Sequence, residues 1–440
     1  MSELFIVLEG DLIGRIRADK AGRLSLSYEP SWRDSTHSHS LSVSMPLADT
    51  TYPHKLVSSY LWNLLPENPN VLQHWGRQYG VSAANPFKLL AYVGADVPGA
   101  AQFIPPERLD EIRSRREPAI DWMRPDELAQ RLAQLRNDVA AMRRPSDVGK
   151  MSLPGAQVKT AYCRDERNNR WGVPSGRAPT THIIKPCVPG FGGLVENEYL
   201  CQDIAARLGM PSAKCSVLAL DQTYIVVERY DRLPAPPGAK FVQRVHQEDT
   251  CQALGLMPGK KYQQDGGPGI SQIMTLIRRV SSNPAADVDR FLDANSFNWL
   301  IGGTDAHAKN YSFLIGASNE VRLAPLYDLS SQLPYHTLIE QRLAMKIGNR
   351  YDIPMVGIAD WRKLAAACKL DFEIVVGRLT QMIDALPDVI TTARDQALTD
   401  KLDRKTVTSL ATHLIRHVKE RHASLVVRGP TSRGRGSSHP

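Results

Sequence analysis

Residues 302–310 read GGTDAHAKN, and they are followed by YSFLI (311–315), a short turn and VRLAPLYD (321–328). Asp305 and Asn310 lie five positions apart in a polar stretch, and Asp328 ends the second apolar run. The pattern predicts a helix, a polar loop, a hairpin and then a second acid. Phosphoryl transfer requires this layout, because one carboxylate orients the attacking hydroxyl while an amide and another carboxylate hold Mg²⁺ on the nucleotide phosphates.

Protein kinases place Asp and Asn at the same D-x-x-x-x-N spacing and put a metal-binding Asp after a hairpin. Asp305 is therefore the candidate base, and Asn310 and Asp328 are the candidate metal ligands. Gly, Asp and Asn also gather in ordinary surface turns for backbone reasons, so each residue taken alone favours a turn. The combination of spacing, hairpin and terminal acid favours the phosphotransfer interpretation.

A lysine and two acids upstream match the same chemistry. The predicted strand THIIKP (181–186) contains Lys185, which is similar to the lysine that pairs with nucleotide phosphates from a central strand. The predicted helix 195–209 carries Glu196 and Glu198 in its first turn, where either acid is able to brace Lys185. The alternative for each acid, a solvated residue at a helix start, is the commoner case, and the sequence does not say which of the two would pair with Lys185.

Two further stretches are weaker candidates for nucleotide contact. KMSLPGAQVKTAYC (150–163) places Pro154-Gly155-Ala156 between two potential strands, where small residues allow backbone N–H groups to approach phosphate. The local sequence alone favours the alternative, a plain hairpin turn. SVLALDQTYIVVERYDRL (216–233) predicts a hairpin that ends near Glu228 and Tyr230, the candidates for an inter-lobe connector.

The rest of the pattern divides into a strand-rich half and a helical half. We predict short strands over 4–30, a strand at LSVSMPL (41–47), helices within 55–90, a connector over 105–119 and a helix over 125–144. Further helices are predicted over 247–256, 270–280, 287–303 and within 359–424, with a glycine-rich loop, KKYQQDGGPG, at 260–269. This order is typical of a two-lobed ATP-dependent phosphotransferase.

Length and composition indicate a globular protein of two or three units, with 440 residues of which 42% are hydrophobic and 23% charged. No apolar run is long enough to span a bilayer and no secretory signal is evident, so we expect a cytoplasmic location without membrane contact. The six cysteines form no C-x-x-C pair, which argues against a zinc cage or a disulfide framework. His413 and His417 have metal-ligand spacing, but the basic residues around them favour a solvated helix face.

Positive charge is concentrated at the C-terminus. Residues 401–440 hold nine Lys or Arg against two acids, which is +7 of the formal net charge of +8. Such a basic segment is typical of contact with nucleic acid or an acidic partner. A disordered, solvated terminus has the same composition, so both interpretations stay open.

Several long strings in this order resemble one family, the HipA serine/threonine kinase toxins of bacterial toxin–antitoxin systems. They are SLPGAQVKT (152–160), THIIK (181–185), ENEY (196–199), VERYDR (227–232), QEDTCQ (247–252), DGGPGI (265–270), GGTDAHAKN (302–310) and LYDLSS (326–331). The resemblance extends over nearly the whole chain. It implies an α+β, bilobal protein-kinase-like fold with an extra N-terminal β-rich subdomain and a mainly helical C-lobe.

The resemblance also implies a domain plan and a site. The expected ranges are an N-terminal subdomain at 1–110, a kinase N-lobe at 111–235, a helical C-lobe at 236–427 and a basic tail at 428–440. Asp305 is implied as the catalytic base, with Asn310 and Asp328 as magnesium ligands. The implied ATP-binding residues are Pro154, Gly155, Ala156, Gln157, Val158, Lys159, Lys185, Glu228, Arg229, Tyr230, Asp231, His307, Lys309 and Tyr327.

Regulation and partners follow from the same resemblance. It implies self-phosphorylation at Ser152, a HipB-like helix-turn-helix antitoxin, operator DNA bound together with that antitoxin, nucleoid association in that complex, and an aminoacyl-tRNA synthetase, typically the glutamyl enzyme, as substrate. Two alternatives stay open. One is a kinase-shaped corepressor with little catalysis, and the other is a small-molecule kinase, since the phosphotransfer machinery does not identify which hydroxyl it receives.

Overall fold

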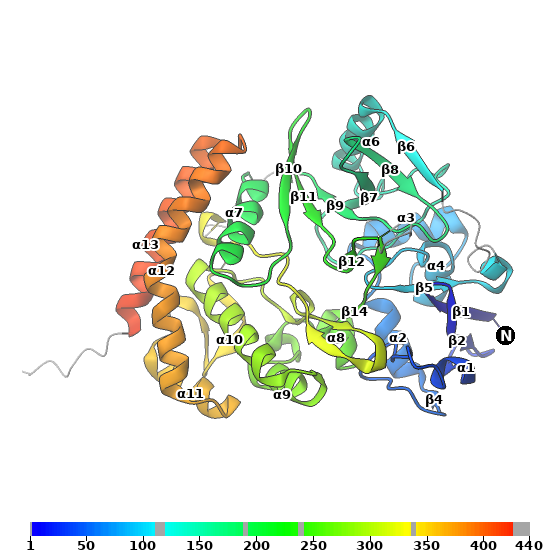
Figure 1. Cartoon of the computed structure of the whole chain (residues 1–440), viewed down its shortest axis with the longest axis horizontal. Helices are drawn as coiled ribbons and strands as arrows, with labels where there is room; N and C mark the ends of the chain where they lie inside the picture. Colours follow the sequence, from blue (N-terminus) through cyan, green and yellow to red (C-terminus); the bar gives the residue numbers. More distant parts are fainter. Residues whose placement is uncertain (1, 111–118, 188–191, 236–241, 336–339, 426–440) are drawn as a thin grey trace, which may run out of the picture.

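An antiparallel five-stranded sheet forms the N-terminal unit of the computed structural model, which describes residues 2–110, 119–187, 192–235, 242–335 and 340–425. Its strand order is β4-β3-β2-β1-β5. The strands are β1 (Ser2–Leu8), β2 (Asp11–Ala18), β3 (Leu24–Tyr28), β4 (Thr51–Tyr52) and β5 (Ala101–Ile104), and the helices are α1 (Pro30–Arg33), α2 (His54–Trp62), α3 (Pro69–Tyr79) and α4 (Pro86–Val93). Figure 1 shows this unit at the right, beside the chain start.

The predictions for this unit are confirmed, with one exception. The strands expected within 4–30 and the helices expected within 55–90 are present. LSVSMPL (41–47) is not a strand but a tight turn, with an isolated bridge between Ser42 and Met45. The Ser42 hydroxyl accepts a hydrogen bond from Ser44 N at 3.1 Å, and Val43 N donates to the Glu248 carboxylate at 2.8 Å. These local and long-range bonds outweigh the alternating pattern that predicted a strand.

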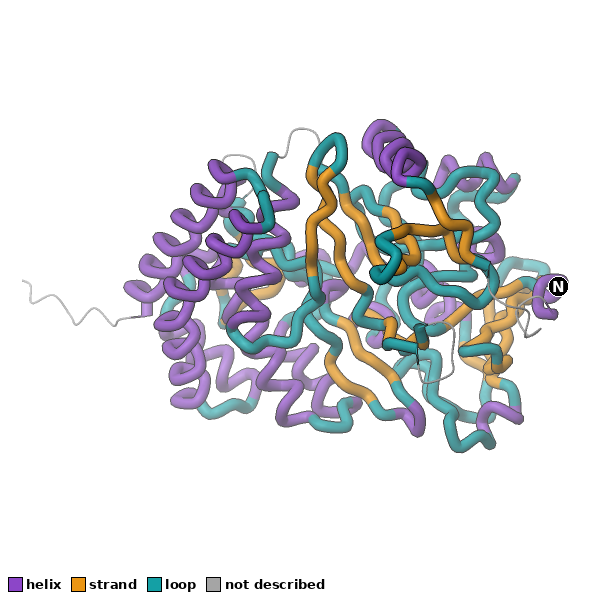
Figure 2. Tube along the Cα trace, turned by 45° about the horizontal axis from the view of Figure 1, so that its top comes forward, coloured by secondary structure: helices purple, strands orange, loops and turns teal. Residues whose placement is uncertain are grey.

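A second, six-stranded sheet has the order β10-β11-β9-β7-β8-β6 and lies near the centre of Figures 1 and 2. The strands are β6 (Ile120–Met123), β7 (Thr160–Asp165), β8 (Arg170–Pro174), β9 (His182–Lys185), β10 (Cys215–Ala219) and β11 (Thr223–Glu228). Tyr224 and Val226 share a core with α6 (Pro125–Asn137), whereas Ile225 and Val227 share a core with α7 (Leu194–Arg207). The two-residue repeat of β11 therefore gives each face of the sheet its own helix.

Helix α6 is shorter than the predicted 125–144. The backbone of Asp138 is extended, and its carboxylate accepts a hydrogen bond from Ala140 N at 2.9 Å. Aspartate forms such local turns in competition with the helix, so the apolar stripe alone overestimated the helix length. The strand at 181–186, the helix at 195–209 and the hairpin within 216–233 are confirmed.

The C-terminal half is mainly helical, as predicted. It contains α8 (Thr250–Ala253), α9 (Ile270–Val280), α10 (Pro284–Ile301), α11 (Ile358–Cys368), α12 (Phe372–Thr399) and α13 (Arg404–Leu425). Strands β14 (His246–Asp249), β15 (Ser312–Ile315) and β16 (Val321–Leu323) form a small sheet, so the start of the helix predicted over 247–256 is a strand instead. Two further two-stranded sheets pair β12 (Arg232–Leu233) with β13 (Gln243–Arg244) and β17 (Arg342–Ile347) with β18 (Arg350–Asp352).

The C-terminal helices correct one expectation and leave others untested. His417 on α13 is buried and contacts the Trp299 carbonyl at 3.3 Å, so it does not lie on a solvated basic face. Within the described ranges, none of the helices has the length and hydrophobicity to cross a bilayer.

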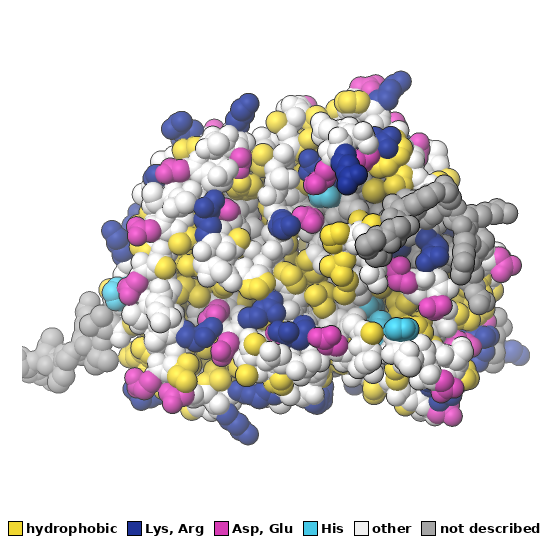
Figure 3. Space-filling view, viewed as in Figure 1, with side chains coloured by type: hydrophobic (Ala, Val, Ile, Leu, Met, Phe, Trp, Pro, Cys, Tyr) yellow, Lys and Arg dark blue, Asp and Glu magenta, His cyan; other side chains and the backbone are white. Residues whose placement is uncertain are grey.

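On the face in Figure 3, Lys and Arg side chains lie interspersed with Asp and Glu. The predicted tail, 428–440, lies outside the described residues, and the predicted domain ranges stay a prediction.

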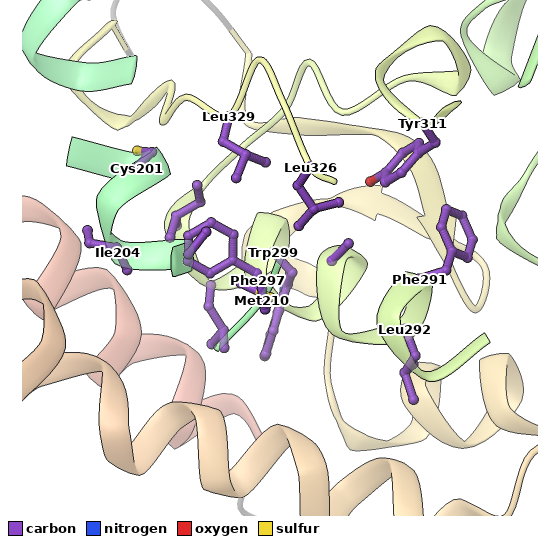
Figure 4. Packing of buried hydrophobic residues seen from close by; sticks show 14 of the residues in the cluster. Cys201, Ile204, Met210, Phe291, Leu292, Phe297, Trp299, Tyr311, Leu326 and Leu329 are labelled. Atoms are coloured by element: carbon purple, nitrogen blue, oxygen red, sulfur yellow. The ribbon is translucent and has the colours of Figure 1, made fainter. Parts of the chain in front are cut away.

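Helix α10 lies at the centre of the largest hydrophobic core and leads directly into the polar loop 303–310. Phe291, Phe297 and Trp299 are fully buried, and Figure 4 shows them packed beneath Tyr311, Leu326 and Leu329. The helix ends at Gly302, whose φ of +69° is a left-handed cap that glycine adopts without strain. The chain therefore leaves the core abruptly, and residues 303–310 form a loop above it.

A buried charge cluster joins the N-terminal unit to the end of β11. Asp96 contacts Arg232 at 3.0 Å and Arg244 at 3.4 Å, and it accepts a hydrogen bond from Thr180 N at 3.0 Å. Arg229 pairs with Asp231 at 2.9 Å and also donates to the Val97 carbonyl. Burial would raise the pKa of Asp96, but the neighbouring arginines lower it to about 2.

We expect Asp96→Ala to lower the free energy of unfolding by about 3–5 kcal/mol, because it leaves buried guanidinium groups without their carboxylate. Asp49→Ala is the matched control, since Asp49 is 90% exposed and pairs with Arg33 at the surface. That variant should lose no more than about 1 kcal/mol. Urea unfolding of both variants is the measurement, and equal losses would contradict the assignment of the cluster as a structural link.

Candidate active site

All but two of the predicted site residues line one cavity of about 500 Å³. Short segments of the N-terminal unit, the second sheet, α7, β14 and the 305–312 loop line this cavity. Asp305, Asn310, Asp328 and Lys185, which are separated by up to 143 positions in the chain, all belong to the lining. The structure therefore brings together the residues that the sequence assigned to phosphotransfer.

Asp305 is open to the cavity and sits in a hydrogen-bonded loop. Its backbone carbonyl accepts bonds from His307 N at 2.8 Å and from the Asn310 side-chain amide at 3.1 Å. The Tyr262 hydroxyl donates to its Oδ1 at 2.5 Å. The surrounding protein raises the pKa of Asp305 by desolvation, the charge of Asp328 adds to this effect, and the hydrogen bond from Tyr262 opposes it.

Lys185 is the electrostatic centre of the site. Its ammonium lies 2.7 Å from Glu198 Oε1 and 2.7 Å from Asp328 Oδ1. Burial alone would lower the pKa of Lys185, but the two carboxylates outweigh it and raise that pKa above its usual range. Of the two acids left open by the sequence, Glu198 is the one that braces Lys185.

Asp328 has a backbone conformation that side chains other than glycine rarely adopt, with a φ of +59°. Such strain persists where the surroundings enforce it, and it clusters at functional sites. Lys185 holds the pKa of Asp328 well below its usual range, so this carboxylate is ionised at neutral pH. The turn thus presents a strained, fully charged acid to the cavity.

The donor chemistry around Asp328 fits magnesium. Asn310 uses its amide nitrogen for the Asp305 carbonyl, which leaves the amide oxygen as its ligand atom. Asp328 engages Lys185 through Oδ1, so Oδ2 is the second oxygen donor. Mg²⁺ is bound in kinases by one or two such oxygens together with phosphates. In the part of the chain that the structure describes, no three His, Cys, Asp or Glu residues form a self-sufficient metal cage.

Residues 153–157 and Lys159 form another wall of the cavity. Gly155 has a φ of +103°, and its carbonyl accepts a hydrogen bond from Glu67 N of the N-terminal unit at 3.1 Å. Lys159 donates to the Pro154 carbonyl at 2.7 Å, and burial, aided by Lys185, lowers its pKa to about 8. The segment has the backbone freedom and the positive charge expected of a phosphate-binding loop.

Two predicted residues of this segment lie outside the cavity. Val158 is half-buried and packs against the core of the N-terminal unit. Ser152 is fully buried, and its hydroxyl donates to the Leu64 carbonyl at 2.7 Å. In this conformation neither side chain is placed to contact a nucleotide.

The end of β11 and the connector that follows it line part of the cavity with Glu228, Arg229, Tyr230 and Asp231. The Tyr230 ring stacks on Tyr327 with centroids 5.5 Å apart. The side chains of Arg229 and Asp231 bond to each other within the buried charge cluster. A planar ligand at this end therefore meets stacked aromatic rings and a rigidly anchored backbone.

The two other predicted residues of the loop are held by the protein. Lys309 contacts Asp249 at 2.5 Å and the Asn63 side-chain oxygen at 2.8 Å. Burial lowers the pKa of His307 to about 3, so its ring is neutral. The Lys309 ammonium is thus already engaged by a carboxylate and an amide oxygen of the protein.

Sequence reasoning missed several lining residues. Asn63 and Glu67 come from the N-terminal unit, and no local motif marks them. Lys261, which lines the cavity, and Tyr262, which does not line it but contacts Asp305, lie in the loop KKYQQDGGPG, whose glycines were noticed but whose tyrosine was not. Tyr262 and Asp305 are 43 positions apart, so no short motif in the sequence predicts their contact.

Comparisons with known proteins agree with this geometry. A family model described as HipA-like C-terminal domain matches residues 151–390, and one described as HipA N-terminal domain matches residues 4–104. The putative kinase Y4mE of Sinorhizobium fredii is 33% identical over 87% of this chain and 89% of that protein. The serine/threonine-protein kinase toxin HipA of Shewanella oneidensis is 30% identical over 87% of each chain.

A solved structure shows the same fold. In the complex of HipA, HipB and operator DNA from Shewanella oneidensis MR-1, the matching chain is 27% identical, with a TM-score of 0.82 over 96% of this chain and 97% of that one. The likeness confirms the predicted fold class, a mixed α and β architecture of the kinase type.

We expect Glu198→Gln to weaken ATP binding about tenfold, because the loss of a charge-assisted bond worth about 1.5–3 kcal/mol leaves Lys185 poorly held. Glu196→Gln is the matched control, since Glu196 is buried on the same helix turn while Lys185 pairs with Glu198 and Asp328. Titration calorimetry with MgATP is the measurement. Equal weakening by both variants would show that burial on α7, not the ion pair, is what matters.

Proposed function

The chain belongs to the HipA family of kinases, and on that premise we propose that it is an ATP- and Mg²⁺-dependent serine/threonine protein kinase acting as the toxin of a toxin–antitoxin pair. The observation that carries the proposal is the convergence of Asp305, Asn310, Asp328 and Lys185 on one cavity. A surface turn would not require these side chains, drawn from three separate segments, to face the same space.

In the proposed reaction, the hydroxyl of the acceptor serine or threonine donates a hydrogen bond to Asp305. The acceptor oxygen forms a bond to the γ-phosphorus of ATP, the bond from that phosphorus to the bridging oxygen breaks, ADP leaves, and Asp305 takes the hydroxyl proton. The raised pKa of Asp305 favours this proton transfer. The carboxylate thus acts by orienting the hydroxyl as well as by accepting its proton.

The remaining residues bind and orient the nucleotide. Lys185 and the segment 154–159 would contact the phosphates, while Tyr230, Tyr327 and the backbone of 228–231 would hold the adenine. Asn310 and Asp328 would hold Mg²⁺, which neutralises charge that develops on the phosphates. His307, neutral and buried beneath Asp305, would support the loop without adding charge.

Partners are proposed by analogy with the solved relative, which is in complex with HipB and operator DNA. We propose a HipB-like antitoxin and operator DNA as partners of this chain, and an aminoacyl-tRNA synthetase as its protein substrate. The segment that would add basic contacts to DNA, residues 428–440, lies outside the described residues. The protein substrate is proposed over a small molecule because the matched family includes a serine/threonine-protein kinase.

We expect Asp305→Asn and Asp328→Asn each to lower phosphate transfer from MgATP by about 10²–10⁴-fold, since one removes the base and the other a metal ligand. Glu320→Gln, at an exposed turn, should keep full activity. Radiolabelled ATP measures the transfer, and phosphoproteomics of cells making wild type or Asp305→Asn identifies the substrate. Full transfer by the Asp305 variant would refute the assigned base.

We further expect Ser152→Ala to abolish self-labelling by ATP, whereas Ser409→Ala, on the exposed face of α13, should leave it unchanged. Because the Ser152 hydroxyl is buried against Leu64, labelling requires the 151–158 segment to leave its present position. A phosphate there adds about two negative charges and repels the phosphates of ATP. The labelled protein should therefore bind MgATP at least tenfold more weakly, and unchanged affinity would contradict a regulatory role.

A further inference from the structure

Residues 260–269, called here the 260–269 loop, lie against the polar loop 303–310 that follows α10. The Lys261 carbonyl accepts a hydrogen bond from Ala308 N at 3.1 Å, and the Lys261 ammonium pairs with Glu67 of the N-terminal unit at 2.6 Å. The loop is therefore fastened on one side to residues 305–310 and on the other to α2 and its following turn.

Tyr262 follows Lys261 and contacts two residues of the polar loop, Asp305 and His307. Its hydroxyl donates to Asp305 Oδ1 at 2.5 Å, and its ring meets His307 edge-on with centroids 5.0 Å apart. The Asp305 carboxylate is otherwise open to the cavity. A hydroxyl thus already donates to one of the two carboxylate oxygens that an acceptor hydroxyl could use.

The hydroxyl of an incoming serine would donate a hydrogen bond to Asp305, as the Tyr262 hydroxyl already does. A base accepts its proton from a hydroxyl at hydrogen-bond distance, about 2.6–3.2 Å. Tyr262 satisfies that requirement with a group of the same chemistry, an O–H donor. Two hydroxyls cannot occupy the same position on Oδ1, so an acceptor that approaches this oxygen must displace Tyr262.

We propose that Tyr262 is a built-in stand-in for the acceptor, which occupies the hydroxyl position on Asp305 until a substrate displaces it. The proposal rests on the function proposed above, because it needs Asp305 as the base. It adds that the 260–269 loop controls entry of the acceptor, and that the Lys261–Glu67 pair links this control to the N-terminal unit.

The surroundings allow Tyr262 to withdraw. Gln264, Asp265 and Gly266 are exposed, and Tyr262 itself is only half-buried. The Lys261–Glu67 pair is partly exposed, with 16% and 18% of the two side chains accessible. Local segments with few buried contacts open more readily than core helices. Tyr262 therefore lies on a partly exposed segment that is able to move, whereas the polar loop 303–310 is held by its own hydrogen bonds.

The test uses water as the acceptor, so that no substrate need be known. Hydrolysis of MgATP by the full chain forms a bond from water oxygen to the γ-phosphorus, breaks the bond to ADP and passes the proton to Asp305. Tyr262→Phe keeps the ring on His307 and removes only the hydroxyl. We expect kcat for hydrolysis to rise at least threefold with the KM for ATP unchanged.

The control is Tyr92→Phe, which removes an exposed hydroxyl from a ring stacked on Tyr79 in the N-terminal unit. It should match wild type, and adding Asp305→Asn to Tyr262→Phe should abolish the gain. An unchanged or reduced kcat in Tyr262→Phe would overturn the proposal, as would a changed KM for ATP without a change in kcat.

The role of Asp305 as base and the role of Tyr262 can be refuted separately. If wild type hydrolyses ATP, Asp305→Asn does not, and Tyr262→Phe shows no gain, then the base assignment stands and the stand-in role of Tyr262 is wrong. If hydrolysis is absent in wild type or survives in Asp305→Asn, the proposed function fails, and the role of Tyr262 fails with it.

Discussion

The ammonium of Lys185, held between Glu198 and Asp328, is the interaction on which the site depends. It joins three elements that are distant in sequence, namely β9, α7 and the turn after β16. Burying one cation with one anion often costs as much as it gains, so a buried pair is not in itself a source of stability. The second carboxylate, Asp328, is partly exposed to the cavity. A cation in the cavity is therefore able to compete with Lys185 for Asp328, and a phosphate is able to compete with Asp328 for Lys185.

This arrangement also explains why the N-terminal unit is more than an attached domain. Asn63 holds Lys309, Glu67 holds Lys261, and Asp96 anchors the arginines at the end of β11. Each of these contacts fixes a segment that lines the cavity. The shape of the cavity therefore depends on contacts that cross from residues 2–104 to the rest of the chain, and the N-terminal family match covers almost the same residues.

What the sequence predicted well was local. The D-x-x-x-x-N spacing, the following hairpin and the amphipathic helices are short-range patterns, and the hairpin and most of these helices were found at the expected place. The failures have two causes. In 41–47 a distant contact outweighs local preference, because Glu248 fixes a turn in a strand-like pattern. In 125–144 a local turn at Asp138 ends the helix early. The choice between Glu196 and Glu198 and the contact of Tyr262 with Asp305 depend on the packing of α7 and of the 260–269 loop, which no residue spacing encodes.

The charges of the cavity identify where an anion would bind. Among the described residues, four lysines line it, and three of them are paired with carboxylates: Lys185 with Glu198 and Asp328, Lys261 with Glu67, and Lys309 with Asp249. Lys159 differs, because its ammonium donates to the Pro154 carbonyl, and within the described ranges no carboxylate forms an ion pair with it.

Burial with only a carbonyl as partner lowers the pKa of Lys159 to about 8, which means that its charged form lacks full compensation. A phosphate oxygen beside it would supply the missing negative charge and raise the pKa of Lys159 again. The positive charge available to a nucleotide is therefore concentrated on the 153–159 segment, next to the Lys185 pair. The other two lysines instead fix the loops that carry Asp305 and Tyr262.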